Sequence, residues 1–196
     1  TKMDEAFAAR IHKELLDKSI KMEKKTKIVS RTPDTVTLSS GKVLRTKTVI
    51  WTGGIRIQEL TRQSGMKTGQ LGRIIVDEFL NVEEYPSIYA IGDNALAVNP
   101  HSKEAVPAAA QFALQQGRLA ADNIYADISG RMRKSYHPKL LGEVVGLGRH
   151  LAVGWLALPF FKKITFVGFL GSLLKTAVQK KHIFLLRKES RKWITY

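Results

Sequence analysis

Cysteine is missing from this 196-residue sequence, and acidic residues are scarce relative to basic ones. Without cysteine the chain can form neither disulfide bonds nor thiolate-ligated metal sites. It also cannot carry the redox-active cysteine pair of disulfide-reducing enzymes. Chemistry that depends on a thiol of this chain is therefore excluded.

Metal-ligand and hydrolase patterns are missing too. The histidines and acidic residues form no cluster at metal-ligand spacing, and no serine has the context of a hydrolase nucleophile. Gly146–Ala152 begins with Gly-x-Gly but has Leu151 where a dinucleotide fingerprint needs its third glycine. We therefore expect no metal site and no catalytic side chain in this chain.

Long apolar runs are also lacking. The first residues show no apolar signal-peptide core. Leu151–Phe161 is uncharged but too short to span a bilayer, and two lysines separate it from the next apolar run, Ile164–Leu174. The sequence predicts two amphipathic helices that lie in the membrane interface.

Positive charge, in contrast, is abundant. The formal net charge is +15, a balance typical of proteins that bind nucleic acid or an anionic membrane. Residues 162–196 hold nine Lys or Arg and one Glu, interleaved with aromatic and aliphatic residues. The amphipathic pattern favours an anionic membrane surface and no nucleic acid partner. Helices packed on the core or on a second subunit are one alternative, and a non-catalytic nucleic-acid-binding module is another.

The centre of the chain is organised around a short strand and the residues that follow it. Ser87–Ile91 is uncharged and rich in β-branched and aromatic residues, which predicts a strand buried on both faces. It ends at Gly92 and Asp93, so a carboxylate is expected at the sheet edge where ligands of open α/β sheets bind. Gly92 would let such a ligand approach closely.

A helix is expected to begin beside this strand end. Pro107 stands where proline is favoured in a first helical turn, and Ala108–Ala126 continues with strong helix formers. The helix N-terminus favours negative charge on a ligand, while Asp93 accepts hydroxyl groups. The pair suits a ligand with a polyol and an electron-rich ring edge.

The remaining elements are short. We expect a second buried strand at Thr48–Trp51 that opens into Thr52, Gly53 and Gly54, where the backbone can approach a cofactor. The other expected elements are helices at 4–16 and 58–64, strands at 28–29, 35–38, 42–44, 73–77 and 144–148, and an extension at 155–161.

Several motifs together resemble a known family. Ile88–Ala95, Ile-Tyr-Ala-Ile-Gly-Asp-Asn-Ala, is similar to the second flavin-binding motif of the two-dinucleotide-binding-domain flavoproteins. Ala110–Gly117, Ala-Gln-Phe-Ala-Leu-Gln-Gln-Gly, resembles type II NADH:quinone oxidoreductases within that family. Trp51–Gly54 and Gly72–Asp77 precede them in the family's order. Almost the whole chain resembles the carboxyl-terminal half of such an enzyme.

The resemblance implies an α/β fold, the carboxyl-terminal part of a two-dinucleotide-binding-domain flavoprotein followed by amphipathic membrane-associating helices. Residues 1–52 would end the NAD-binding domain. Residues 53–142 would form the carboxyl-terminal part of the FAD-binding domain, and 143–196 a sheet extension and membrane-anchoring tail. Because the chain starts without Met and lacks both glycine-rich fingerprints, we expect it to begin in mid-gene, with the amino-terminal half absent.

The resemblance also implies site residues. FAD would contact a set of backbone and side-chain groups from three segments: Thr52, Gly53, Gly54, Gly92, Asp93, Asn94, Ala95, Ala109, Ala110 and Gln111. Gln111 and Gln115, four residues apart on one helical face, would hydrogen-bond a quinone carbonyl. Packing alone is the alternative role for both glutamines.

The implied activity is flavin-dependent electron transfer from NADH to membrane quinone without proton pumping. The expected enzyme is a peripheral protein on the cytoplasmic side of the cell membrane, and we expect a homodimer. A soluble FAD- and NAD-linked reductase of another acceptor is the alternative. Without the missing half, the chain by itself is expected to be inactive.

Overall fold

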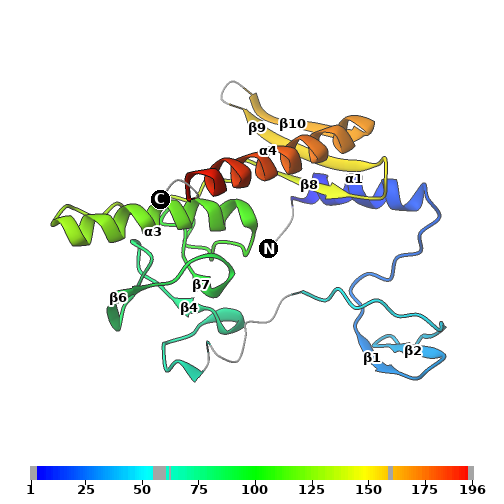
Figure 1. Ribbon diagram of the computed structural model, residues 1–196. Helices are drawn as coiled ribbons and strands as arrows, with labels where there is room; N and C mark the ends of the chain where they lie inside the picture. The colour runs from blue at the N-terminus through cyan, green and yellow to red at the C-terminus, as the bar shows by residue number, and fades with distance from the viewer. Residues whose placement is uncertain (1–3, 55–60, 62, 159–160, 194–196) are drawn as a thin grey trace. The chain divides into compact units, whose positions relative to one another are not determined.

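A computed structural model describes residues 4–54, 61, 63–158 and 161–193, and it divides them into two compact units (Figure 1). The first unit covers the described residues up to Gly54, and the second covers those from 61 onward. The segment 143–193 therefore belongs to the same compact unit as the central region.

The first unit contains a helix and a small antiparallel sheet. Helix α1 (Glu5–Leu16) begins at Asp4, whose carboxylate accepts the Phe7 N–H at 2.9 Å and so caps the helix. Strands β1 (Ile28–Arg31), β2 (Thr35–Leu38) and β3 (Val43–Arg45) pair in that order. The helix and the hairpin predicted through Gly41 are confirmed.

The strand predicted at Thr48–Trp51 is wrong. These residues form no strand, and the side chains of Ile50 and Trp51 are 82% and 73% exposed. A strand of a parallel sheet needs hydrogen-bonding neighbours on its edges and layers on both faces. No described strand pairs with this segment, so its apolar pattern is not enough to form one.

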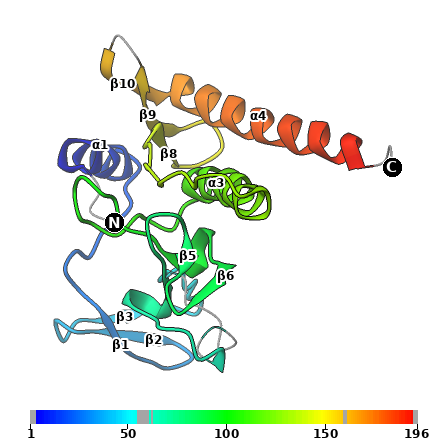
Figure 2. The same ribbon diagram turned by 90° about the vertical axis from the view of Figure 1, so that its left-hand side faces the viewer.

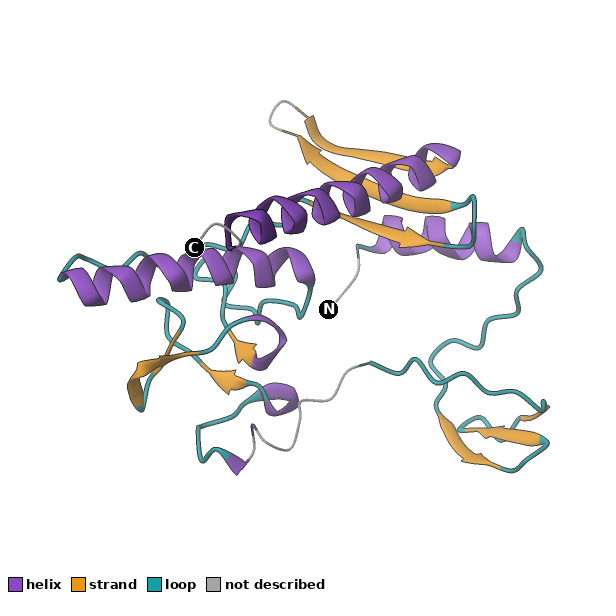
Figure 3. Cartoon of the chain, viewed as in Figure 1, coloured by secondary structure: helices purple, strands orange, loops and turns teal. Residues whose placement is uncertain are grey.

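The second unit begins with short strands around a common core (Figure 3). Strand β4 (Ile74–Ile75) pairs in parallel with β7 (Ala95–Leu96), and β5 (Asn81–Val82) pairs antiparallel with β6 (Tyr85–Tyr89). The 3-10 turn η1 (Gln70–Gly72) precedes β4, and a second one, η2 (Gly92–Asn94), lies between β6 and β7. The core residues are Ile74, Val76, Leu80, Val82, Ala90, Ala95, Ala97, Val106, Phe112 and Tyr136.

The central strand is less buried than its sequence predicts. Strand β6 ends at Tyr89, its first three residues are exposed, and Tyr85 is 41% exposed. The prediction of a strand buried on both faces is therefore wrong. The described strands supply β6 with one antiparallel neighbour, β5, and an edge strand of this kind leaves one side open to solvent.

Helix α3 (Ala110–Ser129) follows a loop and ends at Gly130 in the left-handed conformation. Its N-cap residue is Ala109, so Pro107 lies two residues before the cap and outside the first turn. The predicted position of Pro107 in the helix is therefore wrong. The helix begins later because Ala109 still has extended backbone angles.

The carboxyl-terminal part forms a three-stranded sheet and one helix. Strands β8 (Gly142–Gly146), β9 (Ala152–Leu158) and β10 (Phe161–Gly168) pair antiparallel, with β9 in the middle. Helix α4 (Phe169–Trp193) contacts all three strands and then extends beyond the sheet (Figure 2).

The two predicted interfacial helices are therefore wrong. The first run, Leu151–Phe161, lies largely in strand β9, and the second, Ile164–Leu174, is divided between strand β10 up to Gly168 and helix α4 from Phe169. A single helix, α4, begins after Gly168. None of the described helices combines the length and apolar character that a bilayer crossing requires. The strand predicted at Val144–Gly148 is confirmed in part, since β8 ends at Gly146, and the extension predicted from Trp155 lies in β9 up to Leu158. Residues 159–160 lie outside the described residues, as does most of the helix predicted at 58–64.

Candidate functional site

The turn η2 presents Asp93 to solvent. Gly92 has a φ of +67°, a left-handed conformation that favours glycine, and a tight turn follows the extended Ile91. Asp93 is exposed, and no hydrogen bond from the described residues reaches its carboxylate. The oxygens of Asp93 are therefore available to accept hydrogen bonds from a ligand.

Helix α3 starts beside this turn. The helix contacts η2, and a Cβ atom placed on Gly92 would lie 3.5 Å from the Ala113 Cβ. No side chain caps the helix at Ala109, so the first N–H groups, those of Ala110 and Gln111, have no partner within the helix. The structure thus places the turn that carries the predicted carboxylate against the first two turns of the predicted helix.

Gln116, which the sequence interpretation did not assign a role, connects the two. Its side chain is only 1% exposed, and its Oε1 accepts the Gly92 N–H at 2.6 Å. On its other side, the Gln116 Nε2 and the Tyr136 hydroxyl are buried without a partner at hydrogen-bond geometry. Burial raises the pKa of Tyr136, and the Gln116 side chain partly offsets this rise.

Arg73 is a second buried polar residue beneath the turn. Arg73 is only 5% exposed. Its Nη2 donates to the carbonyls of Ala95 and Val106, the latter at 3.0 Å. Burial lowers the pKa of Arg73, and the charge of Asp93 opposes this change. Arg73 therefore links the end of the turn to the segment that leads into α3.

Ala95 is engaged within the protein. Its N–H donates to the Gly92 carbonyl, and its own carbonyl accepts from Arg73. Both of its backbone groups therefore have protein partners. Its contact with a cofactor stays a prediction, as do those of Gly92 and Asn94.

Gln111 and Gln115 bind the backbone of residues 139–142, which lead into β8. The Gln111 side chain donates to Gly142 and accepts from Leu141, each at 3.1 Å. The Gln115 side chain likewise donates to and accepts from Lys139, at 2.8 and 2.9 Å. Each amide keeps a second N–H and a second lone pair for other partners. Packing and ligand binding are therefore compatible roles.

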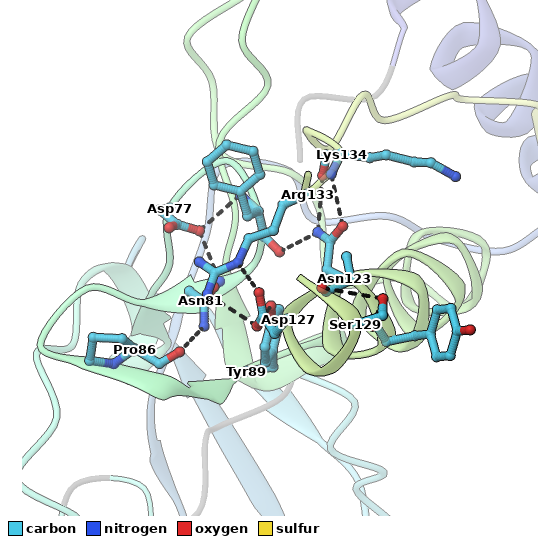
Figure 4. Close-up of polar contacts among 12 residues, drawn as sticks. Asp77, Asn81, Pro86, Tyr89, Asn123, Asp127, Ser129, Arg133 and Lys134 are labelled. Atoms are coloured by element: carbon cyan, nitrogen blue, oxygen red, sulfur yellow. Dashed lines mark hydrogen bonds and ion pairs between the residues drawn. The ribbon is translucent and has the colours of Figure 1, made fainter. Parts of the chain in front are cut away.

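The far end of α3 carries a separate polar cluster (Figure 4). The Tyr89 hydroxyl donates to Asp127 at 2.7 Å, and Arg133 donates to the same carboxylate at 2.6 and 3.1 Å. Burial, followed by this hydrogen bond, raises the pKa of Tyr89 to about 12. The bonds from Arg133 and Tyr89 lower the pKa of Asp127. This cluster joins β6 to the end of the helix.

The predicted cofactor contacts Thr52, Gly53 and Gly54 belong to the first unit, whereas Asp93 and α3 belong to the second. All three residues are exposed, and Gly54 has a φ of +108°. Their approach to the cofactor stays a prediction. Within the described residues, no three His, Asp or Glu side chains gather in a way that could hold a metal ion.

The site fits the polyol and ring edge of a flavin. An exposed carboxylate without protein donors can accept ribityl hydroxyls, and uncapped N–H groups can donate to an electron-rich ring edge. The two groups are held next to each other by contacts within one compact unit. The contact of Asp93, Ala110 and Gln111 with this part of FAD stays a prediction.

The fold matches parts of solved oxidoreductase structures. The sulfide:quinone oxidoreductase of Aquifex aeolicus superposes with a TM-score of 0.71, at 20% identity, over 92% of this chain and 45% of that chain. The NDH2 of Plasmodium falciparum, solved in complex with NADH, superposes with a TM-score of 0.69, at 16% identity, over 89% of this chain and 50% of that chain. At these identities the likeness shows the fold alone.

The sequence matches curated relatives as well. A type II NADH:quinone oxidoreductase of Haemophilus influenzae is 28% identical over 161 residues, which are 82% of this chain and 36% of the relative. The chain thus spans about a third of the length of the curated relatives it matches. Residues 1–117 match the family described as pyridine nucleotide-disulphide oxidoreductase. With this match over more than half of its length, the chain belongs to the pyridine nucleotide-disulphide oxidoreductase family, with distant homology to type II NADH:quinone oxidoreductases.

Proposed function

We propose that this chain is the carboxyl-terminal part of an enzyme that transfers electrons from NADH through FAD to membrane quinone without pumping protons. The observation that supports this most is the exposed Asp93 carboxylate on a turn that contacts α3. Helix α3 begins without a side-chain cap at Ala110, and Gln111 follows directly. The distant homology to type II NADH:quinone oxidoreductases supports the same acceptor. In this proposal the first unit ends an NAD-binding domain and the second completes an FAD-binding domain.

The residues of this chain bind and orient the cofactor. Asp93 accepts hydrogen bonds from the ribityl hydroxyls, and the N–H groups at the start of α3 stabilise negative charge on the pyrimidine edge of the ring. FAD, when bound, supplies the transfer of two electrons between NADH and quinone.

Gln111 and Gln115 are proposed to contact the quinone. Their bonds to the 139–142 backbone fix the orientation of both amides, and each amide retains one N–H that can donate to a quinone carbonyl. A neutral donor stabilises charge that builds on that oxygen without holding the product as an ion pair would.

Helix α4 is proposed to dock the enzyme on an anionic membrane from the cytoplasmic side. Its apolar side chains Phe169, Leu173 and Phe184 are 71%, 55% and 66% exposed, and Lys180 and Lys181 lie exposed between them along the helix. Apolar side chains that enter the interface and lysines that meet anionic headgroups both favour such docking. A homodimer stays a prediction.

The visible absorption spectrum of the purified full-length protein tests the proposal. We expect a bound flavin that bleaches when NADH is added under argon and is reoxidised when a soluble quinone follows. A colourless protein, with no flavin released on heating, would contradict FAD binding. Bleaching by NADH without reoxidation by quinone would instead favour another acceptor.

Gln111→Leu separates the two half-reactions. We expect reduction by NADH to persist while quinone turnover falls at least about tenfold, because a donor to the quinone carbonyl is lost. Stopped-flow absorbance measures each half-reaction. Asn123→Leu, which removes another α3 carboxamide with bonds to backbone but no proposed contact with quinone, is the matched control. Equal loss of both half-reactions in Gln111→Leu would assign that residue a structural role only.

A further inference from the structure

Two buried polar side chains hold the two ends of the turn that presents Asp93. Gln116 binds the Gly92 N–H before Asp93, and Arg73 binds the Ala95 carbonyl after it. The two side chains come from distant parts of the sequence, one from α3 and one from the residue before β4. Asp93 and Asn94, between these two points, are exposed.

A polar side chain is unusual at the buried position of Gln116. Gln116 lies on the buried face of α3 with Phe112 and Ala120, where an apolar side chain would pack without a polar atom to satisfy. Its Nε2 has no partner at hydrogen-bond geometry within the described residues, and leaving a buried donor unpaired costs stability. The bond from the Gly92 N–H is therefore the hydrogen bond of ordinary geometry that this side chain makes among the described residues, and the Tyr136 hydroxyl lies near enough for Gln116 to affect its pKa.

Arg73 shows the same pattern at the other end. A buried guanidinium is costly unless its donors are used, and its Nε has no partner among the described residues. Its Nη2 nevertheless donates to the carbonyls of Ala95 and Val106, which lie near the two ends of the loop between the turn and α3. Arg73 therefore ties the carboxylate side of the site to its helix side.

We propose that Gln116 and Arg73 are positioning residues that fix the Asp93 carboxylate for ribityl binding. This inference rests on the proposed function, since it assumes that Asp93 binds the flavin. A turn held at both ends loses little conformational freedom when the ligand arrives, so less of the binding energy is spent on ordering Asp93. Neither residue needs to touch the flavin.

A double-mutant cycle in the full-length protein tests the proposal. Gln116→Met keeps the length of the side chain and removes the oxygen that accepts from Gly92. We expect FAD affinity, measured by quenching of flavin fluorescence, to fall about tenfold. In an Asp93→Ala background the same substitution should change affinity less than about twofold, because it acts through Asp93.

Asn123→Leu is the matched control. Asn123 is also a buried carboxamide on α3, but it binds the backbone of Phe79 and Lys134 at a distance from the turn. We expect it to lower the melting temperature about as much as Gln116→Met and to leave FAD affinity unchanged.

Arg73→Lys is the second variant. It keeps the positive charge but loses the guanidinium group that donates to the carbonyls of Ala95 and Val106. It should weaken FAD binding even if Gln116→Met fails to fold.

The outcomes separate the inference from the proposed function. If Asp93→Ala leaves FAD affinity unchanged, the ribityl assignment itself is overturned. If Asp93→Ala weakens binding but Gln116→Met and Arg73→Lys do not, the positioning role is overturned. Losses that simply add in the Asp93→Ala background would also overturn it, since they would show that neither residue acts through Asp93.

Discussion

At the scale of single residues, buried polar side chains form contacts that the spacing of residues along the sequence did not predict. The four-residue spacing of Gln111 and Gln115 correctly places both on one side of α3, but Gln116 is the residue that reaches the turn. Its burial follows from the stripe of Phe112 and Ala120, which lie four residues to either side. A polar residue within such a stripe indicates a specific buried hydrogen bond, and that signal was available in the sequence.

Tyr89 gives a prediction at this scale. Its pKa is raised to about 12 by burial and by its bond to Asp127, whereas an unfolded tyrosine titrates near 10. Between these values the unfolded chain loses the proton that the folded chain keeps, so stability falls as pH rises from about 10 to 12. Tyr89→Phe should remove this part of the loss.

Urea unfolding at pH 9, 10.5 and 11.5 measures the effect. The contribution of Tyr136, whose pKa burial also raises, is present in both proteins and cancels in the comparison. Tyr125→Phe, at a tyrosine that is 58% exposed, is the control and should follow the wild type. A Tyr89→Phe protein with the same alkaline loss as wild type would contradict the assignment.

At the scale of elements, local patterns predict hairpins well and sheet partners poorly. The antiparallel strands β2 and β3 follow from alternation and from Gly41, because the turn and both strands are adjacent in sequence. The apolar runs that form β9 and β10 also fit helical spacing, and short runs of this kind do not distinguish the two structures. The pairing of β9 with both β8 and β10 decides the outcome, and the spacing of the apolar residues does not encode that pairing.

Two glycine-to-alanine substitutions in helices should have opposite effects. A Cβ on Gly171 in α4 would lie 2.7 Å from the Ala152 carbonyl carbon, so Gly171→Ala must push the helix off β9 and should cost about 1 to 3 kcal/mol. A Cβ on Gly117 in α3 would meet Ile91 at an ordinary 3.8 Å, so Gly117→Ala should gain up to about 1 kcal/mol from helix propensity.

Chemical unfolding followed by circular dichroism compares the two substitutions, and each serves as the control for the other. Because both add one methyl group to a helical glycine, a shared change in propensity cannot produce opposite signs. Stabilisation by Gly171→Ala would mean that α4 does not pack closely on β9.

At the scale of the whole molecule, charge is predictable from composition but its placement is not. Residues 162–196 hold a large share of the excess positive charge, and the sequence indicated an anionic membrane surface there. Residues 162–168 of this segment belong to β10 and residues 169–193 to α4, which extends beyond the sheet (Figure 2). A deletion from Lys162 onward would therefore also remove a sheet strand, so point substitutions are the better test.

Lys180→Glu/Lys181→Glu should weaken binding to anionic vesicles by at least about tenfold, because each lysine near such a surface contributes about 1 kcal/mol. Vesicle co-sedimentation at low and high salt measures the loss, which should shrink as salt screens the charges. The matched control, Lys21→Glu/Lys24→Glu, changes the net charge by the same amount at two exposed lysines of the first unit. If both double variants lose binding equally, net charge rather than α4 governs attraction to the membrane. If only the α4 variant loses binding, the helix is the docking element.

In that case Phe184→Ser, at a side chain that is 66% exposed, should weaken vesicle binding at high salt as well as at low salt. Salt does not screen the apolar contribution to docking.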